Sequence, residues 1–235
     1  ETQMTNCLFC GHSNSTKAFE VQDIFNDQYQ WRVCQNCSTE FLAPQPSEEQ
    51  LARAYDPSYY GEGEKKFIPI VEAVVDFFRR RNAKSLAKHF GKKGRVLDIG
   101  CGNGNLLHYL GKAGEFELHG IEPEGKSAER AEAHEEINLH KGFLQKGLYK
   151  NDMFDAISLV HVFEHLPNPS EALDIIDDVL KEKGKLLIEI PNISSWQSRI
   201  FKSNWLHLDP PRHLQLTPPD VLIEELERRG YKLVR

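Results

Sequence analysis

The stretch that most constrains the fold is residues 96–107, VLDIGCGNGNLL. Its first half is apolar and strand-like, glycines follow at Gly100, Gly102 and Gly104, and a helical pattern begins directly after them. Glycines in such a turn let the backbone come close to a ligand, and the first amides of the helix point at it. The stretch therefore predicts a ligand-binding strand–turn–helix unit.

The chain beyond this unit repeats the same alternation. Strand-like segments at 95–100, 116–122, 154–160 and 185–191 are separated by helical segments that begin near 104 and span 125–136 and 170–184. Strands that alternate with helices form a parallel sheet with crossover connections. We therefore expect an α/β fold, with a Rossmann-like sheet that carries helices on both faces and binds its ligand at the carboxyl ends of the strands.

The charges around the glycines restrict the ligand. The spacing is G-x-G-x-G, and Asn105 stands where a dinucleotide fingerprint has its third glycine. Asp98, two residues before the loop, would repel a pyrophosphate but attract a cation. Glu122 ends the next strand, at a place where an acid commonly binds ribose hydroxyls. No P-loop lysine follows, so the pattern favours a cationic ligand with a ribose and no phosphates.

A second motif lies near the N-terminus. Four cysteines form two C-x2-C pairs separated by 23 residues, and they are Cys7, Cys10, Cys34 and Cys37. Four thiolates complete the tetrahedral shell of a structural Zn²⁺, so the spacing predicts a zinc ribbon; iron or a redox dithiol are the alternatives. Residues 1–46 carry five acids against Lys17 and Arg32. That balance disfavours nucleic acid as a partner of the ribbon.

From Gly94 to Arg235 the sequence resembles the class I S-adenosylmethionine-dependent methyltransferases, through VLDIGCGNG, IEPE, FDAISLVHVFEHL and LKEKGKLLIEIPN. The resemblance implies that S-adenosylmethionine is the cofactor. Its methionine end would be held by Asp98 and the loop, its ribose by Glu122, and its adenine would lie between Phe143 and Leu144. The implied cofactor-binding residues are Asp98, Gly100, Cys101, Gly102, Asn103, Gly104, Glu122, Pro123, Phe143, Leu144, Val160 and His161. The family sheet ends in an antiparallel hairpin, of which GYKLVR (230–235) would begin the first strand.

The candidate catalytic residues are His213, as a base, and Arg212, as a binder of a substrate anion. Their segment resembles the loop that bears the catalytic histidine in deoxysugar C-methyltransferases, which also carry a cysteine-rich zinc module; a structural role for His213 is the alternative. HVFEH (161–165) matches an inverted zinc-protease motif, but prolines follow at once and would end the helix that this motif needs. We therefore expect His165 to be a hydrogen-bonded loop residue.

The length and composition limit how the chain can be divided into domains. With 235 residues, 40% hydrophobic and 27% charged, the chain suits one α/β domain and a small module. We expect a zinc ribbon at 1–46, a helical linker or lid at 47–93 that includes Tyr59 and Tyr60, and a methyltransferase domain at 94–235. We see no signal peptide and no segment able to span a membrane, which favours a cytoplasmic protein. Residues 79–95 carry eight Lys or Arg and no acid, within a net charge of −6.

The favoured function is methyl transfer to a small polar metabolite, through oxygen of a sugar or nucleotide-linked sugar. RNA methylation is one alternative, because the basic stretch 79–95 could attract an anionic backbone. Quinone O-methylation is another, since VHVFEHL resembles that group. A non-catalytic cofactor-binding scaffold is the third. The sequence does not identify the methyl acceptor, because acceptor specificity lies in loops around a shared fold.

Overall fold

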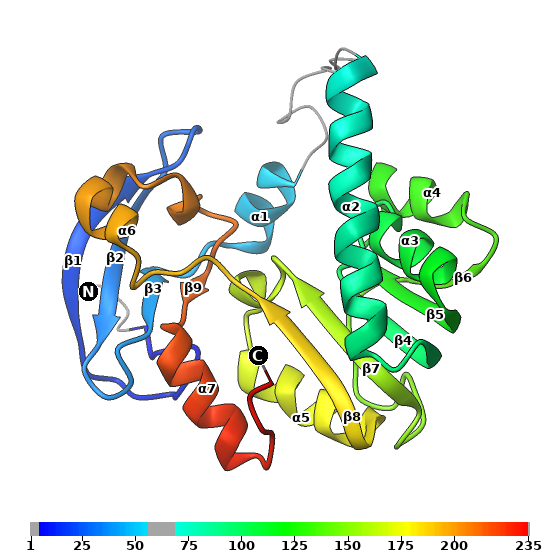
Figure 1. Cartoon of the computed structure of the whole chain (residues 1–235). Helices are drawn as coiled ribbons and strands as arrows, with labels where there is room; N and C mark the ends of the chain where they lie inside the picture. The colour runs from blue at the N-terminus through cyan, green and yellow to red at the C-terminus, as the bar shows by residue number, and fades with distance from the viewer. Residues whose placement is uncertain (1–4, 56–68, 235) are drawn as a thin grey trace. The chain divides into compact units, whose positions relative to one another are not determined.

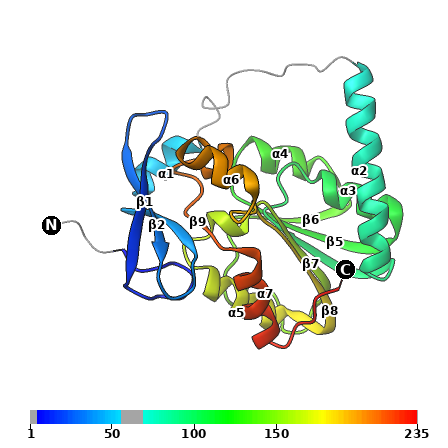
Figure 2. The ribbon, with the colours of Figure 1, turned by 60° about the vertical axis from the view of Figure 1, so that its left-hand side comes forward.

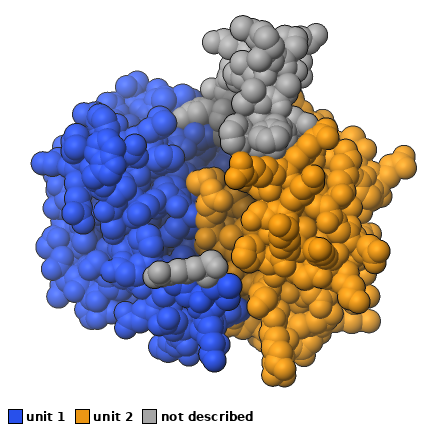
Figure 3. Space-filling view, viewed as in Figure 1, with its two compact units in different colours: residues 1–59, 163–170, 190–235 blue, residues 60–162, 171–189 orange. Residues whose placement is uncertain are grey.

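The computed structural model describes residues 5–55 and 69–234, with the side chains of 69–78 left out. Its contacts divide the chain into two compact units (Figure 3). We call residues 60–162 and 171–189 the sheet unit, and residues 1–59, 163–170 and 190–235 the ribbon unit. Tyr59 and Tyr60 lie outside the described residues. Within the described ranges, no helix has the length and apolar composition needed to cross a membrane.

The sheet unit contains a five-stranded parallel sheet in the order β6-β5-β4-β7-β8 (Figure 1). The strands are β4 (Lys93–Ile99), β5 (Glu115–Glu122), β6 (Ile137–Lys141), β7 (Phe154–Val160) and β8 (Leu180–Glu189). The helices are α2 (Pro69–His89), α3 (Asn105–Ala113), α4 (Lys126–Glu132) and α5 (Pro169–Val179), the last of which begins with two residues of the ribbon unit. In Figure 2, α3 and α4 lie above the strands and α5 lies below them. The Rossmann-like sheet is therefore confirmed.

One apolar cluster holds α2, α3 and α4 against the sheet. Ala83 and Ala87 of α2, Leu107 and Leu110 of α3, and Val96 of β4 are each at most 1% exposed. Small alanines let α2 come close to α3, while the leucines of α3 fill the layer between helix and strands. Burial of a leucine of this kind contributes about 1.5–3 kcal/mol to stability. The packing fixes the start of α3, and with it the glycine loop.

The ribbon unit contains a four-stranded antiparallel sheet in the order β1-β2-β3-β9. Its strands are β1 (Ser15–Gln22), β2 (Gln28–Cys34), β3 (Glu40–Ala43) and β9 (Gln215–Leu216). Its helices are α1 (Glu48–Ala54), α6 (Trp196–Phe201) and α7 (Pro219–Arg228), with 3₁₀ turns η2 (Phe163–His165), η3 (Lys202–Asn204) and η4 (Leu206–Leu208). Figure 1 shows β9, from the C-terminal part of the chain, beside β3. The ribbon sheet therefore includes a strand from far along the sequence.

The start of α1 and the residues after α7 differ in how well their backbone is held. Ser47 caps α1, because its side chain accepts from the Gln50 amide while the Gln50 side chain accepts from the Ser47 amide. The strand expected at the C-terminal end is wrong, since residues 231–234 have no regular secondary structure. Gly230, at φ 95°, follows the end of α7, and the exposed Leu233 and Val234 pair with no neighbouring strand among the described residues. A strand needs such a ladder partner to form.

Candidate functional site

The glycine loop joins the carboxyl end of β4 to α3. Gly100, Gly102 and Gly104 all have positive φ, at 69°, 56° and 76°. A Cβ on Gly100 would collide with the Val162 side chain, whereas a Cβ on Gly102 would meet no atom within 4 Å. The loop is therefore packed tightly against Val162 at Gly100, whereas the space next to Gly102 is open. Such an open backbone surface at the end of a central strand is where a ligand of this fold binds.

Asp98 lies directly beneath the loop and is 4% exposed. Ser158 of the neighbouring strand β7 donates a hydrogen bond from Oγ to Asp98 Oδ1 at 2.6 Å. Burial raises the pKa of the Asp98 carboxyl to about 7; the Ser158 hydrogen bond opposes this shift and the charge of Glu122 adds to it. A cation placed against such a carboxyl would favour its ionised form. Asp98 is therefore suited to hold an ammonium group.

Glu122 ends β5, beside the loop. Its Oε2 accepts a hydrogen bond from the Gly102 amide at 2.9 Å, which fixes the loop to the second strand. Burial raises the pKa of the Glu122 carboxyl, and the Gly102 hydrogen bond lowers it. Only one of its oxygens is engaged in this bond, so the other can accept from a hydroxyl group. The two acids expected from the sequence thus flank the same loop.

The remaining predicted cofactor residues lie at the ends of neighbouring strands. Gly142 donates its amide to the Glu122 carbonyl at 2.9 Å, which brings the segment after β6 to the end of β5. Phe143, in that segment, is 67% exposed. His161, at the end of β7, has φ 55° and its amide donates to the Glu189 carbonyl. Pro123, Leu144 and Val160 are half-buried.

Cys101 and Asn103 act through their backbone and local contacts. The Cys101 side chain is 7% exposed and packs beneath the loop, where a Cβ on Gly120 would lie 2.7 Å from its Sγ. Asn103 Oδ1 accepts from the Asn105 amide at 3.2 Å, at the start of α3. The Cys101 thiol thus belongs to the core.

The four N-terminal cysteines converge in the ribbon unit. Cys7 Sγ lies 3.7 Å from Cys37 Sγ, and Cys10 Sγ lies 3.6 Å from Cys34 Sγ. All four sulfurs lie within 4.8 Å of one another, and none is in a disulfide. A tetrahedral zinc with bonds of about 2.3 Å requires sulfur–sulfur distances of about 3.8 Å. The geometry therefore fits a Cys₄ metal site.

His213 lies in a second polar cluster of the ribbon unit, next to β9. Its Nδ1 lies 2.7 Å from the His207 carbonyl, which can only accept, so Nδ1 carries a proton and Nε2 carries the lone pair. Nε2 lies 4.0 Å from Glu164 Oε1 and 4.0 Å from Asp209 Oδ2. Burial, together with the charge of His165, lowers the pKa of His213 to about 3. The imidazole is therefore neutral at physiological pH.

Glu164 and His165 complete this cluster from the turn η2. Glu164 is 1% exposed, and the His165 and His213 rings lie 4.7 Å apart at an interplanar angle of 65°. His165 Nδ1 lies 2.9 Å from the Arg212 carbonyl and 3.1 Å from the Tyr55 hydroxyl. The side-chain ligand atoms of Glu164, His165 and His213 lie within 4.8 Å of one another. The expectation that His165 is a hydrogen-bonded loop residue is thus met.

Arg212 is engaged with its own loop. Its Nη2 lies 2.6 Å from Asp209 Oδ2, and the side chain is 12% exposed. This pair fixes the turn between the cis peptide at Pro210–Pro211 and His213. The guanidinium contacts an acid of the protein, so an additional substrate anion would have to share it with Asp209.

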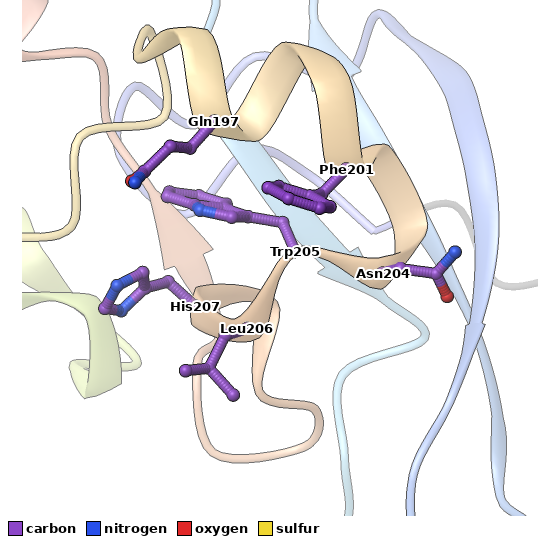
Figure 4. A pocket seen from close by; sticks show the side chains of 6 residues that line it. All are labelled: Gln197, Phe201, Asn204, Trp205, Leu206 and His207. Carbon is purple, nitrogen blue, oxygen red and sulfur yellow. The ribbon is translucent and has the colours of Figure 1, made fainter.

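A shallow hollow of about 290 Å³ opens on the same unit (Figure 4). It is lined by Gln197, Phe201, Asn204, Trp205, Leu206 and His207. In Figure 4 the Trp205 and Phe201 rings lie on one side, and the His207 ring lies below them. Two aromatic rings, those of Phe201 and Trp205, thus form part of the lining of this hollow.

Sequence reasoning missed Ser158 and Glu164 as site residues. Ser158 is a single hydroxyl within a buried strand, and only the strand register that places it opposite Asp98 reveals its role. Glu164 was visible within HVFEH, but its partner His213 lies 49 positions further on. No local pattern connects two such residues.

Comparison with known proteins gives a consistent result. A family model described as a methyltransferase domain matches residues 73–235. The chain is 34% identical over 113 residues to a ubiquinone biosynthesis O-methyltransferase of Glaesserella parasuis, which covers 44% of this chain and 47% of that protein. It is 30% identical over 157 residues to a tRNA U34 carboxymethyltransferase of Pseudomonas fluorescens. That alignment covers 64% of this chain and 49% of the other protein. The chain spans about half the length of these curated relatives.

A solved structure agrees with the sequence matches. A SAM-dependent methyltransferase from Archaeoglobus fulgidus is 26% identical, with a TM-score of 0.53. The superposition covers 66% of this chain and 71% of that one.

Proposed function

This chain belongs to the class I S-adenosylmethionine-dependent methyltransferases, and on that premise we propose that it transfers a methyl group to an oxygen of a small polar metabolite, of which a sugar or nucleotide-linked sugar is the favoured class. The observation that carries the methyl-transfer proposal is the buried Asp98 beneath an open glycine loop, with Glu122 beside it. When bound, S-adenosylmethionine supplies an electrophilic methyl group on a positively charged sulfur.

Each cofactor-binding residue has a distinct task in this proposal. Asp98 accepts from the ammonium of the methionine end, and the Glu122 oxygen that does not bind Gly102 accepts from the ribose. Phe143 is exposed at the edge of the sheet and offers a face for the adenine. Gly102 leaves the room that the cofactor needs, because any side chain there would occupy the open surface.

We propose His213 as the base. The bound cofactor would supply the methyl group and keep the electron pair on its sulfur, and His213 Nε2 would take the proton that the acceptor hydroxyl gives up. A pKa of about 3 makes His213 a weak base at equilibrium. Glu164 and Asp209, each 4.0 Å from Nε2, would stabilise the imidazolium as it forms. Arg212 holds Asp209 in place and shares its charge with an anionic acceptor.

The hollow beside η4 is the proposed place for the acceptor. It combines the Phe201 and Trp205 rings with the polar groups of Gln197, Asn204 and His207. Aromatic faces together with amide groups are typical of sugar-binding surfaces, since a sugar has both apolar C–H faces and hydroxyl groups.

Two other acceptors compete with this proposal. Quinone oxygen is favoured by the likeness to a protein named as a ubiquinone biosynthesis O-methyltransferase. RNA is favoured by the likeness to a tRNA-modifying enzyme and by the exposed cations Arg79, Arg80, Arg81, Lys84 and Lys88 of α2. The acidic residues of 1–46 oppose the RNA alternative.

The test is transfer of radiolabelled methyl from S-adenosylmethionine into fractionated cell extract. Wild type is compared with His213→Gln, Glu164→Gln and, as a matched histidine control on an exposed position, His89→Gln. We expect label in a small polar fraction, reduced by about 10²–10⁴-fold in His213→Gln and unchanged in His89→Gln. Label in lipid or RNA would show that the acceptor belongs to that class and is not a small polar metabolite. Equal label from His213→Gln and wild type would show that His213 is not the base.

We further propose that the cysteine cluster binds a structural Zn²⁺, on the strength of its sulfur–sulfur distances. Elemental analysis of the purified protein should find one zinc per cluster. Cys10→Ser should lose it, because Cys10 is the exposed member and its replacement removes one thiolate with little change in packing. Retention of zinc at the three remaining cysteines of Cys10→Ser would contradict a four-thiolate site.

A further inference from the structure

A third group of metal-ligating side chains lies in the sheet unit, apart from the cysteine cluster. It consists of His108 on α3 and of His134 and Glu136 in the turn between α4 and β6. One ligand atom from each lies within 4.8 Å of the other two. Glu136 Oε1 lies 2.6 Å from His108 Nδ1 and 4.0 Å from His134 Nδ1. Both imidazoles thus turn the same nitrogen toward one carboxylate oxygen.

The backbone holds these three residues in fixed positions. The His108 amide donates to the Gly104 carbonyl in the first turn of α3. The His134 amide donates to the Ala131 carbonyl, and the Ile137 amide donates to the His134 carbonyl, so the turn is closed on both sides. A Cβ on Gly104 would lie 3.1 Å from the His134 ring, which shows how closely the turn packs on the start of α3. The backbone positions of the three residues are therefore set, and a bound ion would need to fix only the rotation of their side chains.

The donor set and its accessibility suit a divalent transition metal. The His108, His134 and Glu136 side chains are 25%, 24% and 45% exposed, so an ion can reach them from solvent. Two imidazoles and a carboxylate are a set that zinc uses in proteins, with a fourth position left for water. Nitrogen ligands favour zinc, cobalt, nickel or copper over magnesium and calcium, which prefer oxygen. Four glutamates between 129 and 136, against Arg130, draw cations to this surface.

We propose that His108, His134 and Glu136 form a binding site for Zn²⁺ or a neighbouring divalent transition metal. The ion replaces the direct His108–Glu136 contact and joins the first turns of α3 to the segment that enters β6. The two ring centroids are 4.5 Å apart, and one ligand atom of each of the three residues already lies within 4.8 Å of the other two, so side-chain rotation can bring them into bonding distance of one ion. This site is independent of the proposed methyl transfer and of the cysteine cluster.

The experiment begins with protein whose cysteine cluster is already filled with zinc, verified by elemental analysis. Cobalt(II) is then titrated while visible and near-ultraviolet absorption are recorded, because thiolate ligands give a charge-transfer band that imidazole and carboxylate do not. We expect one further equivalent of cobalt, with ligand-field bands and no thiolate band. Imidazole ¹H–¹⁵N spectra with added zinc should show the His108 and His134 rings shifting together.

Variants decide between this site and general surface binding. His108→Gln, His134→Gln and Glu136→Gln should each weaken binding at least about tenfold, whereas the neighbouring Glu135→Gln and the exposed His89→Gln should not. Thermal unfolding without metal checks that every variant is folded. The proposal is overturned if no further equivalent binds, if the cobalt spectrum shows thiolate ligands, or if the three variants bind as the wild type does.

Discussion

At the scale of single residues, Asp98 sets a pH dependence that can be measured. Its pKa is about 7 in the folded chain and about 3.8 in an unfolded one, because burial disfavours the charged form. Protonated Asp98 therefore stabilises the fold; this contribution is complete below about pH 3.8 and is lost as the pH rises through about 7. His213 acts in the opposite sense, because burial lowers its pKa from 6.5 to about 3: its neutral form stabilises the fold, and this contribution is complete above about pH 6.5 and is lost as the pH falls toward 3.

The same carboxyl predicts how cofactor affinity changes with pH. If Asp98 must be ionised to bind the ammonium group, affinity for S-adenosylhomocysteine should be about tenfold weaker at pH 6 than its plateau above pH 8. Calorimetric titrations at both pH values measure this ratio. Asp98→Asn should bind weakly at both, with the pH dependence removed. A variant that keeps the wild-type slope would show that another group is responsible.

Alanine substitutions at two glycines of the loop should have different effects, one on stability and the other on cofactor affinity. Gly100→Ala places a methyl group against the Val162 side chain at a positive φ, so we expect a loss of about 1–3 kcal/mol in the free energy of unfolding. Gly102→Ala has open space and costs only about 1 kcal/mol of backbone strain, but its methyl group occupies the ligand surface. Urea unfolding and titration with S-adenosylhomocysteine separate the effects. Wild-type affinity in Gly102→Ala would contradict a ligand at this surface.

At the scale of elements, local signals predicted local structure. The β4–loop–α3 unit and the cap of α1 follow from residues a few positions apart, and both are present. β6 was missed, since five half-polar residues give too little alternation to mark a strand. β9 was missed because it has two residues and exists only through pairing with β3, some 175 positions away. A local sequence pattern does not identify a pairing partner so far along the chain.

The short strand β9 also makes a testable prediction. Gln215 is fully buried, donates from Nε2 to the Phe163 carbonyl at 3.1 Å, and accepts from the Thr217 hydroxyl at 2.5 Å. Gln215→Leu keeps the volume but removes both of these buried hydrogen bonds, so the free energy of unfolding should fall by about 1–3 kcal/mol. Gln35→Leu, which removes an exposed Gln–Thr hydrogen bond, is the control and should cost under about 0.5 kcal/mol. Equal losses would mean that burial does not matter here.

At the scale of the whole molecule, the ribbon unit combines three separate stretches of chain, although sequence alone suggests an N-terminal module that ends at residue 46. The predicted domain boundaries themselves stay a prediction. The unit coheres through β3, which pairs with β9 on one side, while the Leu42 amide donates to the Leu214 carbonyl at 2.9 Å. The Leu214 amide in turn donates to the Glu164 carbonyl. His213 and Glu164 are therefore positioned by the strand that follows the second cysteine pair.

Removal of the metal should consequently destabilise strands of the ribbon unit that lie beyond the cysteines. Cys7 and Cys34 share one buried cluster with Phe41 of β3, so loss of the ion loosens the core on which β3 rests. With a strong chelator, amide hydrogen exchange should accelerate in β2, β3 and β9 together, while β4 and β7, which belong to another core, keep their protection. Cys10→Ser without chelator should reproduce this pattern. If only the residues next to the cysteines lose protection, the cluster stabilises its own loops and does not position His213.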